Sequence, residues 1–233
     1  MLFISPPFGN YISLPYTTCI NGSFTLHPRD GLIMQIIKTL RYSFYYGGWT
    51  NKIGLRNKGI DYGLTKKGIT SIAILNENEI DEFVNRIPNN QNLELNISCP
   101  NLDKHMVQDN LHKFVSQDRE WCIVKLSPND TIETVDKLYK QGFRQFHCCN
   151  TLPVKEGGLS GKTLIPIVSK KIKQIKEKYP DTTIIAGGGI KDIETLKMYK
   201  ECGADHFSVS TIMFNPFKFV PFYYNYYKME SDR

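Results

Sequence analysis

The chain has 233 residues, of which 41% are hydrophobic and 12% aromatic, and its 29 basic and 23 acidic residues give a net charge of +6. This composition is too apolar for a disordered chain, and no apolar run approaches the roughly 20 residues of a membrane helix. The length suits one domain, residues 1–233, because single α/β barrels run to roughly 200–250 residues.

The N-terminal third offers two candidate strands, near Phe8–Ile12 and Thr17–Thr25. Only a few residues separate them, fewer than the dozen or so that a helical crossover requires. If both belong to a barrel, its first outer helix is missing. The stretch Arg29–Gly68 is rich in glycine and basic residues with weak periodicity, and predicts an irregular loop over one end of the fold.

From residue 69 onward, short apolar runs alternate with amphipathic ones. The predicted strands are Ile69–Leu75, Leu93–Ile97, Trp121–Leu126, Gln145–Cys149, Thr183–Ala186 and His206–Val209. The predicted helices are Glu77–Ile87, Val107–Ser116, Ile132–Gln141, Leu164–Tyr179, Asp192–Glu201 and one from about Pro216. Alternating βα units with apolar strands indicate a parallel sheet with helices outside. With the two N-terminal candidates this predicts an α/β fold, a (β/α)8 TIM barrel.

Polar, small or ionisable residues end the predicted strands, and in such a barrel the site lies at this C-terminal face. These residues are Asn96, Ser98, Cys99, Asn101, Lys125, Asn150, Thr151, Gly187, Gly188, Gly189, Ser210 and Thr211. Gly188-Gly189 and Ser210-Thr211 are each expected to open onto a helix, so that two helix N-termini would offer N–H groups to one phosphate. The alternative is that a tight βα turn simply needs glycine.

Lys125 lies inside the apolar run Cys-Ile-Val-Lys-Leu, where an unpaired ammonium would be very costly. It must therefore meet an anion or a polar ligand in the barrel mouth, or pair with a neighbouring carboxylate for structural reasons alone. Asparagine carries both a donor and an acceptor, so a cluster suits the edges of a planar heterocycle, although each alone is more often a turn residue. The candidates are Asn51, Asn96, Asn101 and Asn150.

Cys99 stands between Ser98 and Pro100 at a strand end, a place suited to a base or nucleophile if positive charge lowers the thiol pKa. The six cysteines show no metal-binding spacing, so we expect free thiols, no metal, and a reducing cytoplasmic compartment. The N-terminus has no secretory signal pattern.

All of the excess charge falls in residues 1–68, which hold eight basic and two acidic residues. An arm that binds a polyanion is one interpretation. Because no run of five or six like charges occurs, we favour a few side chains that face a phosphate, and predict no nucleic-acid and no membrane partner.

Several motifs together resemble one enzyme family. They are NLELNISCPN (92–101), VKLSP (124–128), Asn150-Thr151, GGLSG (157–161), IIAGGGI (184–190) and GADHFSVST (203–211), with TLHPRDG (25–31) and WTNKIGLRNKGID (49–61) upstream. Their order and spacing strongly resemble dihydroorotate dehydrogenase over nearly the whole chain. The resemblance implies a barrel that holds FMN and oxidises dihydroorotate to orotate in pyrimidine biosynthesis.

The resemblance also implies roles for residues. Cys99 would be the base that removes the C5 proton while the C6 hydride passes to flavin N5, and a cysteine at this position is similar to the soluble branch of the family. Lys125 would lie beside the flavin ring. The pyrimidine would be bound by Asn51, Asn96, Asn101, Asn150 and Thr151, with Ser98 close by. The flavin and its phosphate would contact Asn96, Asn150, Gly158, Gly188, Gly189, Ser210 and Thr211.

The chain departs from the family pattern at Gly22-Ser23, where the family has a Lys-Ser pair. If the missing lysine weakens flavin binding, Gly22→Lys should tighten it. The alternatives are a catalytically degenerate barrel that binds FMN or another nucleotide, and a dihydrouridine synthase-like pyrimidine reductase. The electron acceptor, whether fumarate, NAD through a partner subunit or another, stays open, and a homodimer is possible.

Overall fold

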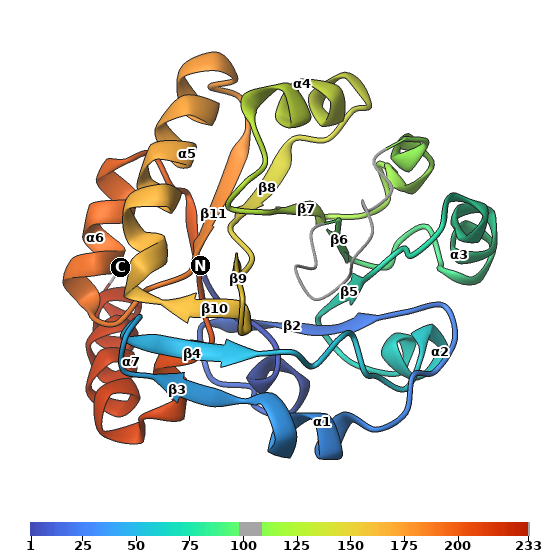
Figure 1. Cartoon of the computed structure of the whole chain (residues 1–233). Helices are drawn as coiled ribbons and strands as arrows, with labels where there is room; N and C mark the ends of the chain where they lie inside the picture. The colour runs from blue at the N-terminus through green and yellow to red at the C-terminus, as the bar shows by residue number, and fades with distance from the viewer. Residues whose placement is uncertain (98–108, 233) are drawn as a thin grey trace.

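A closed barrel of eight parallel strands forms the centre of the molecule, with helices outside it (Figure 1). The computed structural model describes residues 1–97 and 109–232. Around the barrel the strands run β1 (Leu2–Ile4), β12 (His206–Val209), β11 (Thr183–Gly187), β8 (Gln145–Cys148), β7 (Cys122–Leu126), β6 (Leu93–Asn96), β5 (Ile69–Ile72) and β2 (Thr17–Phe24). The predicted TIM barrel is confirmed.

The helices follow the chain order of the barrel. They are α1 (Leu32–Thr39), α2 (Ile60–Leu64), α3 (Ile80–Arg86), α4 (Ile132–Lys140), α5 (Ile165–Lys178), α6 (Ile193–Glu201) and α7 (Pro216–Ser231). Short 3₁₀ turns lie at η1 (Phe8–Asn10), η2 (Glu77–Glu79), η3 (Leu111–Phe114), η4 (Lys162–Leu164) and η5 (Thr211–Phe214). None of the helices in these described ranges is both long and apolar enough to span a bilayer.

The first strand is not where the sequence predicted it. It is the fully buried Leu2–Ile4, which pairs with both β12 and β2, whereas Phe8–Asn10 forms the turn η1. Gly9 allows this turn to pack closely, because a Cβ there would lie 2.2 Å from the carbonyl oxygen of Ile20. Within the described connection from β1 to β2 there is no α-helix, so the missing first outer helix is confirmed.

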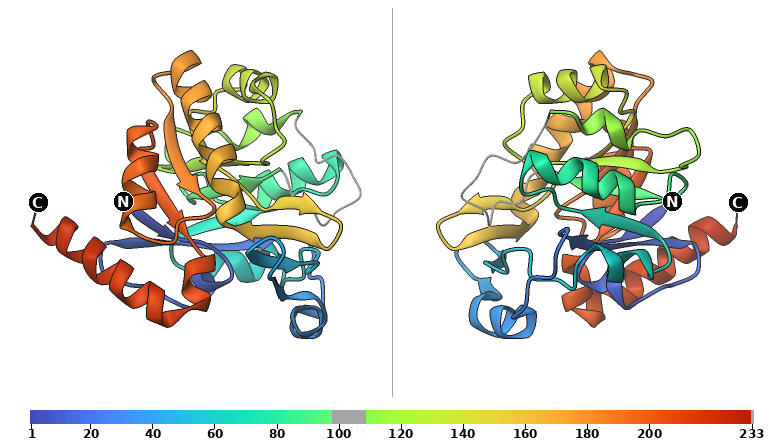
Figure 2. Two further views of the ribbon diagram at one scale, coloured as in Figure 1. Left: turned by 60° about the vertical axis from the view of Figure 1, so that its left-hand side comes forward. Right: turned by 90° about the vertical axis from the view of Figure 1, so that its right-hand side faces the viewer.

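Helix α7 packs beside the connection that lacks a helix (Figure 2). The hydroxyl of Tyr223 donates to the carbonyl oxygen of Pro15 at 3.0 Å, and that of Tyr226 donates to the carbonyl oxygen of Tyr16 at 3.3 Å. Phe222 and Tyr226 are buried. The aromatic C-terminal segment therefore belongs to the barrel's own packing.

Residues 29–68 are not an irregular loop. They contain α1, α2 and the hairpin of β3 (Arg41–Ser43) with β4 (Gly48–Asn51). Strand β4 pairs with β10 (Gly157–Gly161), which pairs with β9 (Leu152–Val154), to give a second sheet of order β3-β4-β10-β9. Because β9 and β10 follow β8, and β3 and β4 follow β2, this sheet lies at the C-terminal end of the barrel. The prediction failed for the second sheet because β4 and β10 lie more than 100 residues apart in the sequence, and for the local helices and hairpin because their periodicity is weak.

One helix was also predicted too long. In the described part of Val107–Ser116 only the short turn η3 forms. The other predicted strands and helices from residue 69 onward are confirmed to within a few residues.

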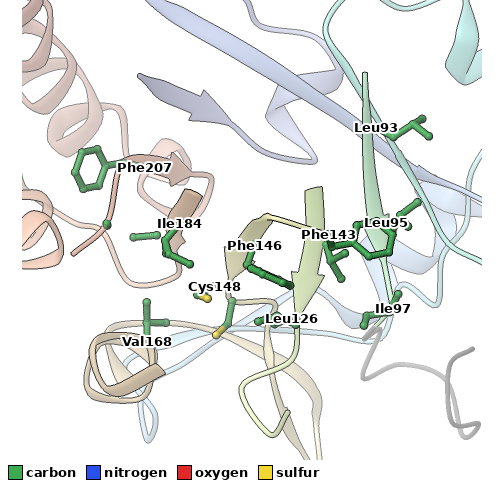
Figure 3. Close-up of a cluster of buried hydrophobic side chains, with 14 of the residues drawn as sticks. Leu93, Leu95, Ile97, Leu126, Phe143, Phe146, Cys148, Val168, Ile184 and Phe207 are labelled. Atoms are coloured by element: carbon green, nitrogen blue, oxygen red, sulfur yellow. The ribbon is translucent and has the colours of Figure 1, made fainter. Parts of the chain in front are cut away.

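Two hydrophobic clusters stabilise the barrel. Side chains that point outward from the strands, among them Leu93, Leu95, Phe146 and Ile184, form one cluster with helix side chains such as Val168 of α5 (Figure 3). A separate cluster fills the barrel interior, and its members are Phe3, Ile20, Ile69, Trp121, Ile123 and Ile185. Each such side chain contributes roughly 1.5–3 kcal/mol by burial. Because side chains alternate along a strand, the next inward-facing positions towards the C-terminal end lie directly above this cluster.

Candidate active site

Polar side chains occupy the layer of the barrel interior above the apolar cluster. Two residues beyond Ile69 is Ser71, two beyond Ile123 is Lys125, and two beyond Phe3 is Ser5. The strand register places Lys125 of β7 opposite His147 of β8 and opposite Asn96 of β6. The inward-facing side chains are therefore apolar in one layer of the barrel and polar in the next layer towards the C-terminal end.

Glu94 is the fully buried anion of this layer. Its Oε2 lies 2.6 Å from Nδ1 of His147, and its Oε1 accepts a 2.8 Å hydrogen bond from the hydroxyl of Ser71. Nζ of Lys125 lies 3.7 Å from Oε1, an ion pair too long for a direct hydrogen bond. Burial by itself raises the pKa of Glu94, but Lys125, His147 and the Ser71 hydroxyl outweigh it and lower the pKa to about 2. The carboxylate is therefore ionised at neutral pH.

His147 is buried beside this carboxylate and is neutral. Burial lowers the pKa of His147, and the opposing effect of Glu94 does not overcome it. Since Glu94 is ionised and can only accept, Nδ1 of His147 carries the proton and donates it, and Nε2 is an acceptor. Lys125 and Glu94 therefore form the charged pair, with His147 as a neutral donor.

A directional chain of hydrogen bonds links the asparagines to Glu94. Nδ2 of Asn150 donates to Oδ1 of Asn96 at 3.0 Å, and Nδ2 of Asn96 donates to the hydroxyl of Ser23 at 2.8 Å. The Ser23 and Ser71 hydroxyls are 2.8 Å apart. Because Ser71 donates to Glu94, Ser23 must donate to Ser71. The structure thus brings Asn96 and Asn150 together and fixes the orientation of the Asn96 amide.

A pocket opens at the C-terminal ends of β1, β7, β8, β11 and β12. Of the residues predicted for the site it is lined by Lys125, Asn150, Thr151, Gly188, Gly189, Ser210 and Thr211. Among the described residues that line it, Lys125 carries the formal charge. None of the eight basic residues of the N-terminal segment lines this pocket.

Other predicted residues lie elsewhere. Asn51 and Gly158 are register partners on β4 and β10, with Nδ2 of Asn51 3.5 Å from the Gly158 carbonyl oxygen, and neither lines the pocket. Ser98, Cys99 and Asn101 lie outside the described residues. The described cysteines, among them the buried Cys148 and the pocket-lining Cys149, are free thiols, as predicted.

The N–H groups predicted to meet a phosphate lie in loops, and the α-helix expected directly after Gly189 begins only further along the chain. Helix α6 begins only at Ile193, and the Asp192 carboxylate already caps it by accepting from the N–H of Thr195 at 2.8 Å. Thr211 begins a 3₁₀ turn of four residues. The N–H groups of Gly188, Gly189, Ser210 and Thr211 find no acceptor within the described chain. Both glycines have positive φ, 94° and 80°, and Tyr199 anchors the loop by donating to the Gly188 carbonyl oxygen at 2.7 Å.

The pocket residues fit a phosphorylated flavin. Unbonded N–H groups at one side suit a phosphate, and the Lys125 ammonium suits an electron-rich ring. The Asn150 amide, which lines the pocket and donates to the adjacent Asn96, suits the edge of a planar heterocycle, whereas Asn96 itself does not line the pocket.

The sequence reasoning missed Glu94, His147, Ser5 and Ser208. Glu94 had the same signal as Lys125, a charge within an apolar strand, and the alternation Leu-Glu-Leu-Asn puts it on the face of Asn96. His147 had the weaker signal of a polar residue inside Phe-His-Cys. Ser5 and Ser208 had none.

Comparisons with known proteins agree on one family. A family model described as dihydroorotate dehydrogenase matches residues 10–221. A protein of Petrotoga mobilis named "Dihydroorotate dehydrogenase B (NAD(+)), catalytic subunit" is 31% identical over 230 residues, covering 82% of this chain and 75% of the relative. One of Malacoplasma penetrans with the same name is 30% identical and covers 73% and 68%. The solved structure of ligand-free DHODH from Eimeria tenella superposes with a TM-score of 0.66 at 18% identity, over 91% of this chain and 78% of that chain.

Proposed function

Because the chain belongs to the dihydroorotate dehydrogenase family, we propose that it oxidises dihydroorotate to orotate in pyrimidine biosynthesis, with FMN held at the C-terminal end of the barrel. The observation that carries this proposal is the pocket, where the Lys125 ammonium and two loops of unbonded N–H groups meet next to the paired amides of Asn96 and Asn150. In this proposal the N–H groups receive a phosphate, Lys125 lies beside a ring, and the amides bind a second planar molecule.

Cofactor binding falls to the loops and to Lys125. Gly188, Gly189, Ser210 and Thr211 would hold the phosphate through their N–H groups. Lys125 would place its ammonium beside the ring, and Glu94 is its partner in an ion pair. When bound, FMN would supply the hydride acceptor. Gly158 is a further cofactor contact carried over from the resemblance alone.

Substrate binding falls to the amide side chains. The Asn96 amide is held by Ser23 and Asn150, and Oδ1 of Asn150 accepts from the N–H of Thr151 at 2.9 Å. Amides fixed in this way lose little freedom when they bind a pyrimidine. Asn51 and Asn101 complete the set by resemblance. Cys99, with Ser98 beside it in the sequence, is proposed as the base that takes the C5 proton of dihydroorotate.

The relatives' names bear on the acceptor. The Petrotoga mobilis protein is named as the catalytic subunit of an NAD+ enzyme. We therefore propose that electrons leave this chain for NAD+ through a partner subunit, and a comparison of turnover with fumarate and with NAD+, in the presence and absence of cell extract, distinguishes the routes.

The direct test is anaerobic mixing of dihydroorotate with the FMN-loaded protein. Bleaching of the flavin absorbance with formation of one orotate per flavin is the expected result. A protein that binds FMN but never bleaches would be the catalytically degenerate barrel. A protein that stays colourless with added FMN would exclude the flavoenzyme function altogether.

A further inference from the structure

Three small polar side chains form the floor of the pocket between Lys125 and the glycine loop. They are Ser5, His147 and Ser208, with exposed fractions of 6%, 2% and 4%. All three line the pocket. The roles proposed above use none of them for binding, although buried polar groups are costly unless they have partners.

His147 presents an acceptor to this floor. Its Nδ1 proton is donated to Glu94, which leaves Nε2 with a lone pair. No described residue donates to Nε2. Gly187 makes room for this edge of the ring, because a Cβ at Gly187 would lie only 2.3 Å from Nε2. The imidazole is therefore held at one edge and open to a ligand at the other.

Ser5 and Ser208 present a donor. Their hydroxyl oxygens are 2.6 Å apart, so one hydroxyl donates to the other. The pair has two hydroxyl protons, and this bond uses one of them. Within the described chain the second proton has no other acceptor. The floor thus offers one acceptor and one donor, and a hydroxyl group is both a donor and an acceptor.

The strand register places this floor between the two ends of the pocket. His147 lies opposite Lys125 on the adjacent strand, and Ser208 lies opposite Gly187, the residue before the loop of Gly188 and Gly189. We propose that Ser5, His147 and Ser208 bind the hydroxyl groups of a polyhydroxylated chain that joins a phosphate to a ring. This rests on the proposed function, in which the ligand is FMN and the chain is its ribityl group.

A useful variant of His147 must remove the Nε2 acceptor that faces the pocket and keep the donor to Glu94 at the Nδ1 position. Asparagine can place an N–H near the position of Nδ1 and lacks the Nε2 acceptor, so His147→Asn keeps the donor to Glu94 and removes only the edge that faces the pocket. Ser208→Ala removes the donor with a minimal change of volume. Ser169→Ala is the matched control, because Ser169 lies on α5 and does not line the pocket.

The test compares two ligands on the full chain freed of flavin. One is FMN and the other is its analogue in which hydrogens replace the side-chain hydroxyls, and quenching of flavin fluorescence reports both affinities. We expect the unaltered protein and Ser169→Ala to bind FMN about tenfold more tightly than the analogue, since one to two hydrogen bonds are at stake. His147→Asn and Ser208→Ala should each lose most of this preference, mainly through weaker binding of FMN.

Two results would overturn the inference. If His147→Asn and Ser208→Ala weaken FMN and the analogue by the same factor, these residues support the pocket without contacting hydroxyls, and the proposed function stands. If neither flavin binds the unaltered protein, the proposed function fails and this inference fails with it.

Discussion

Replacement of Lys125 by methionine tests whether the buried carboxylate of Glu94 depends on the ammonium. Methionine keeps the unbranched apolar stem of lysine, is one atom shorter, and lacks the ammonium. Glu94 is fully buried and would then retain Ser71 and the neutral His147 as partners. A buried charge that has lost its counterion is strongly destabilising.

The size of the effect follows from the separation of the pair. At 3.7 Å, and with the effective dielectric constant of about 20 that suits protein sites, the attraction is about 4.5 kcal/mol. Removal of one partner of a buried pair typically costs 3–5 kcal/mol. We therefore expect Lys125→Met to lower the free energy of unfolding by about 3 kcal/mol at pH 7.5. The double variant Lys125→Met with Glu94→Gln should recover most of this loss.

The loss should also depend on pH. In the unaltered protein the folded-state pKa of Glu94 is about 2, below its ordinary value, so the stability that the pair contributes is fully present above the ordinary pKa and is lost only as the pH falls towards 2. Without the opposing charge of Lys125, burial raises the pKa of Glu94. The folded variant then takes up a proton on acidification, and its deficit should shrink between pH 7.5 and pH 5.

Urea denaturation of the three proteins at both pH values measures these quantities. Glu94→Gln alone serves as the control, because it keeps the shape of the side chain. A loss below 1 kcal/mol for Lys125→Met, with no recovery in the double variant and no dependence on pH, would refute the coupling between Lys125 and Glu94.

Three further predictions test other parts of the molecule. Cys99→Ala should abolish dihydroorotate-dependent bleaching and leave FMN occupancy unchanged, and normal bleaching in a stopped-flow experiment would remove Cys99 as the base. Gly189→Ala should weaken FMN binding about tenfold in a fluorescence titration, because φ is 80° and a Cβ would lie 2.6 Å from Cγ1 of Ile165; unchanged affinity would show that the loop does not hold the phosphate. Phe3→Ala should cost 3–5 kcal/mol in chemical denaturation, because Phe3 is fully buried inside the barrel, and a loss below 1 kcal/mol would mean that the cavity collapses.

The barrel could be predicted from residue 69 onward because its signals are local. Each strand there is a short apolar run that turn residues bound, and each following helix has its own amphipathic period. The N-terminal part gave no such signals. Leu2–Ile4 is only three residues long and depends on β12, more than 200 residues away, for one of its two partners. The pairing of β4 with β10 joins Asn51 and Gly158, which are 107 residues apart, and hydrophobic periodicity within a short window cannot detect it.

The site was predictable where its residues end strands, and not where they lie inside the barrel. Asn150, Gly188 and Ser210 follow apolar runs, so the rule that barrel sites lie at strand ends finds them. Glu94 and His147 lie within strands, where the ordinary expectation is packing. Lys125 was recognised because lysine is rarely buried. Its pairing with a carboxylate is confirmed by Glu94, and its contact with a ligand stays a prediction that its place in the pocket supports.

At Gly22 the family has a lysine, but the backbone of this chain leaves no room there for a side chain. The sequence suggested that Gly22→Lys would restore a lost contact, but φ is 115° at Gly22 and a Cβ would lie 2.4 Å from the carbonyl oxygen of Ser71. Ser71 is the residue whose hydroxyl donates to Glu94, so a side chain at position 22 would disturb the network that holds Lys125. We therefore expect Gly22→Lys to weaken flavin binding, and not to tighten it. Tighter binding by this variant would mean that the β2 backbone can shift away from Ser71 without loss of the Glu94 network.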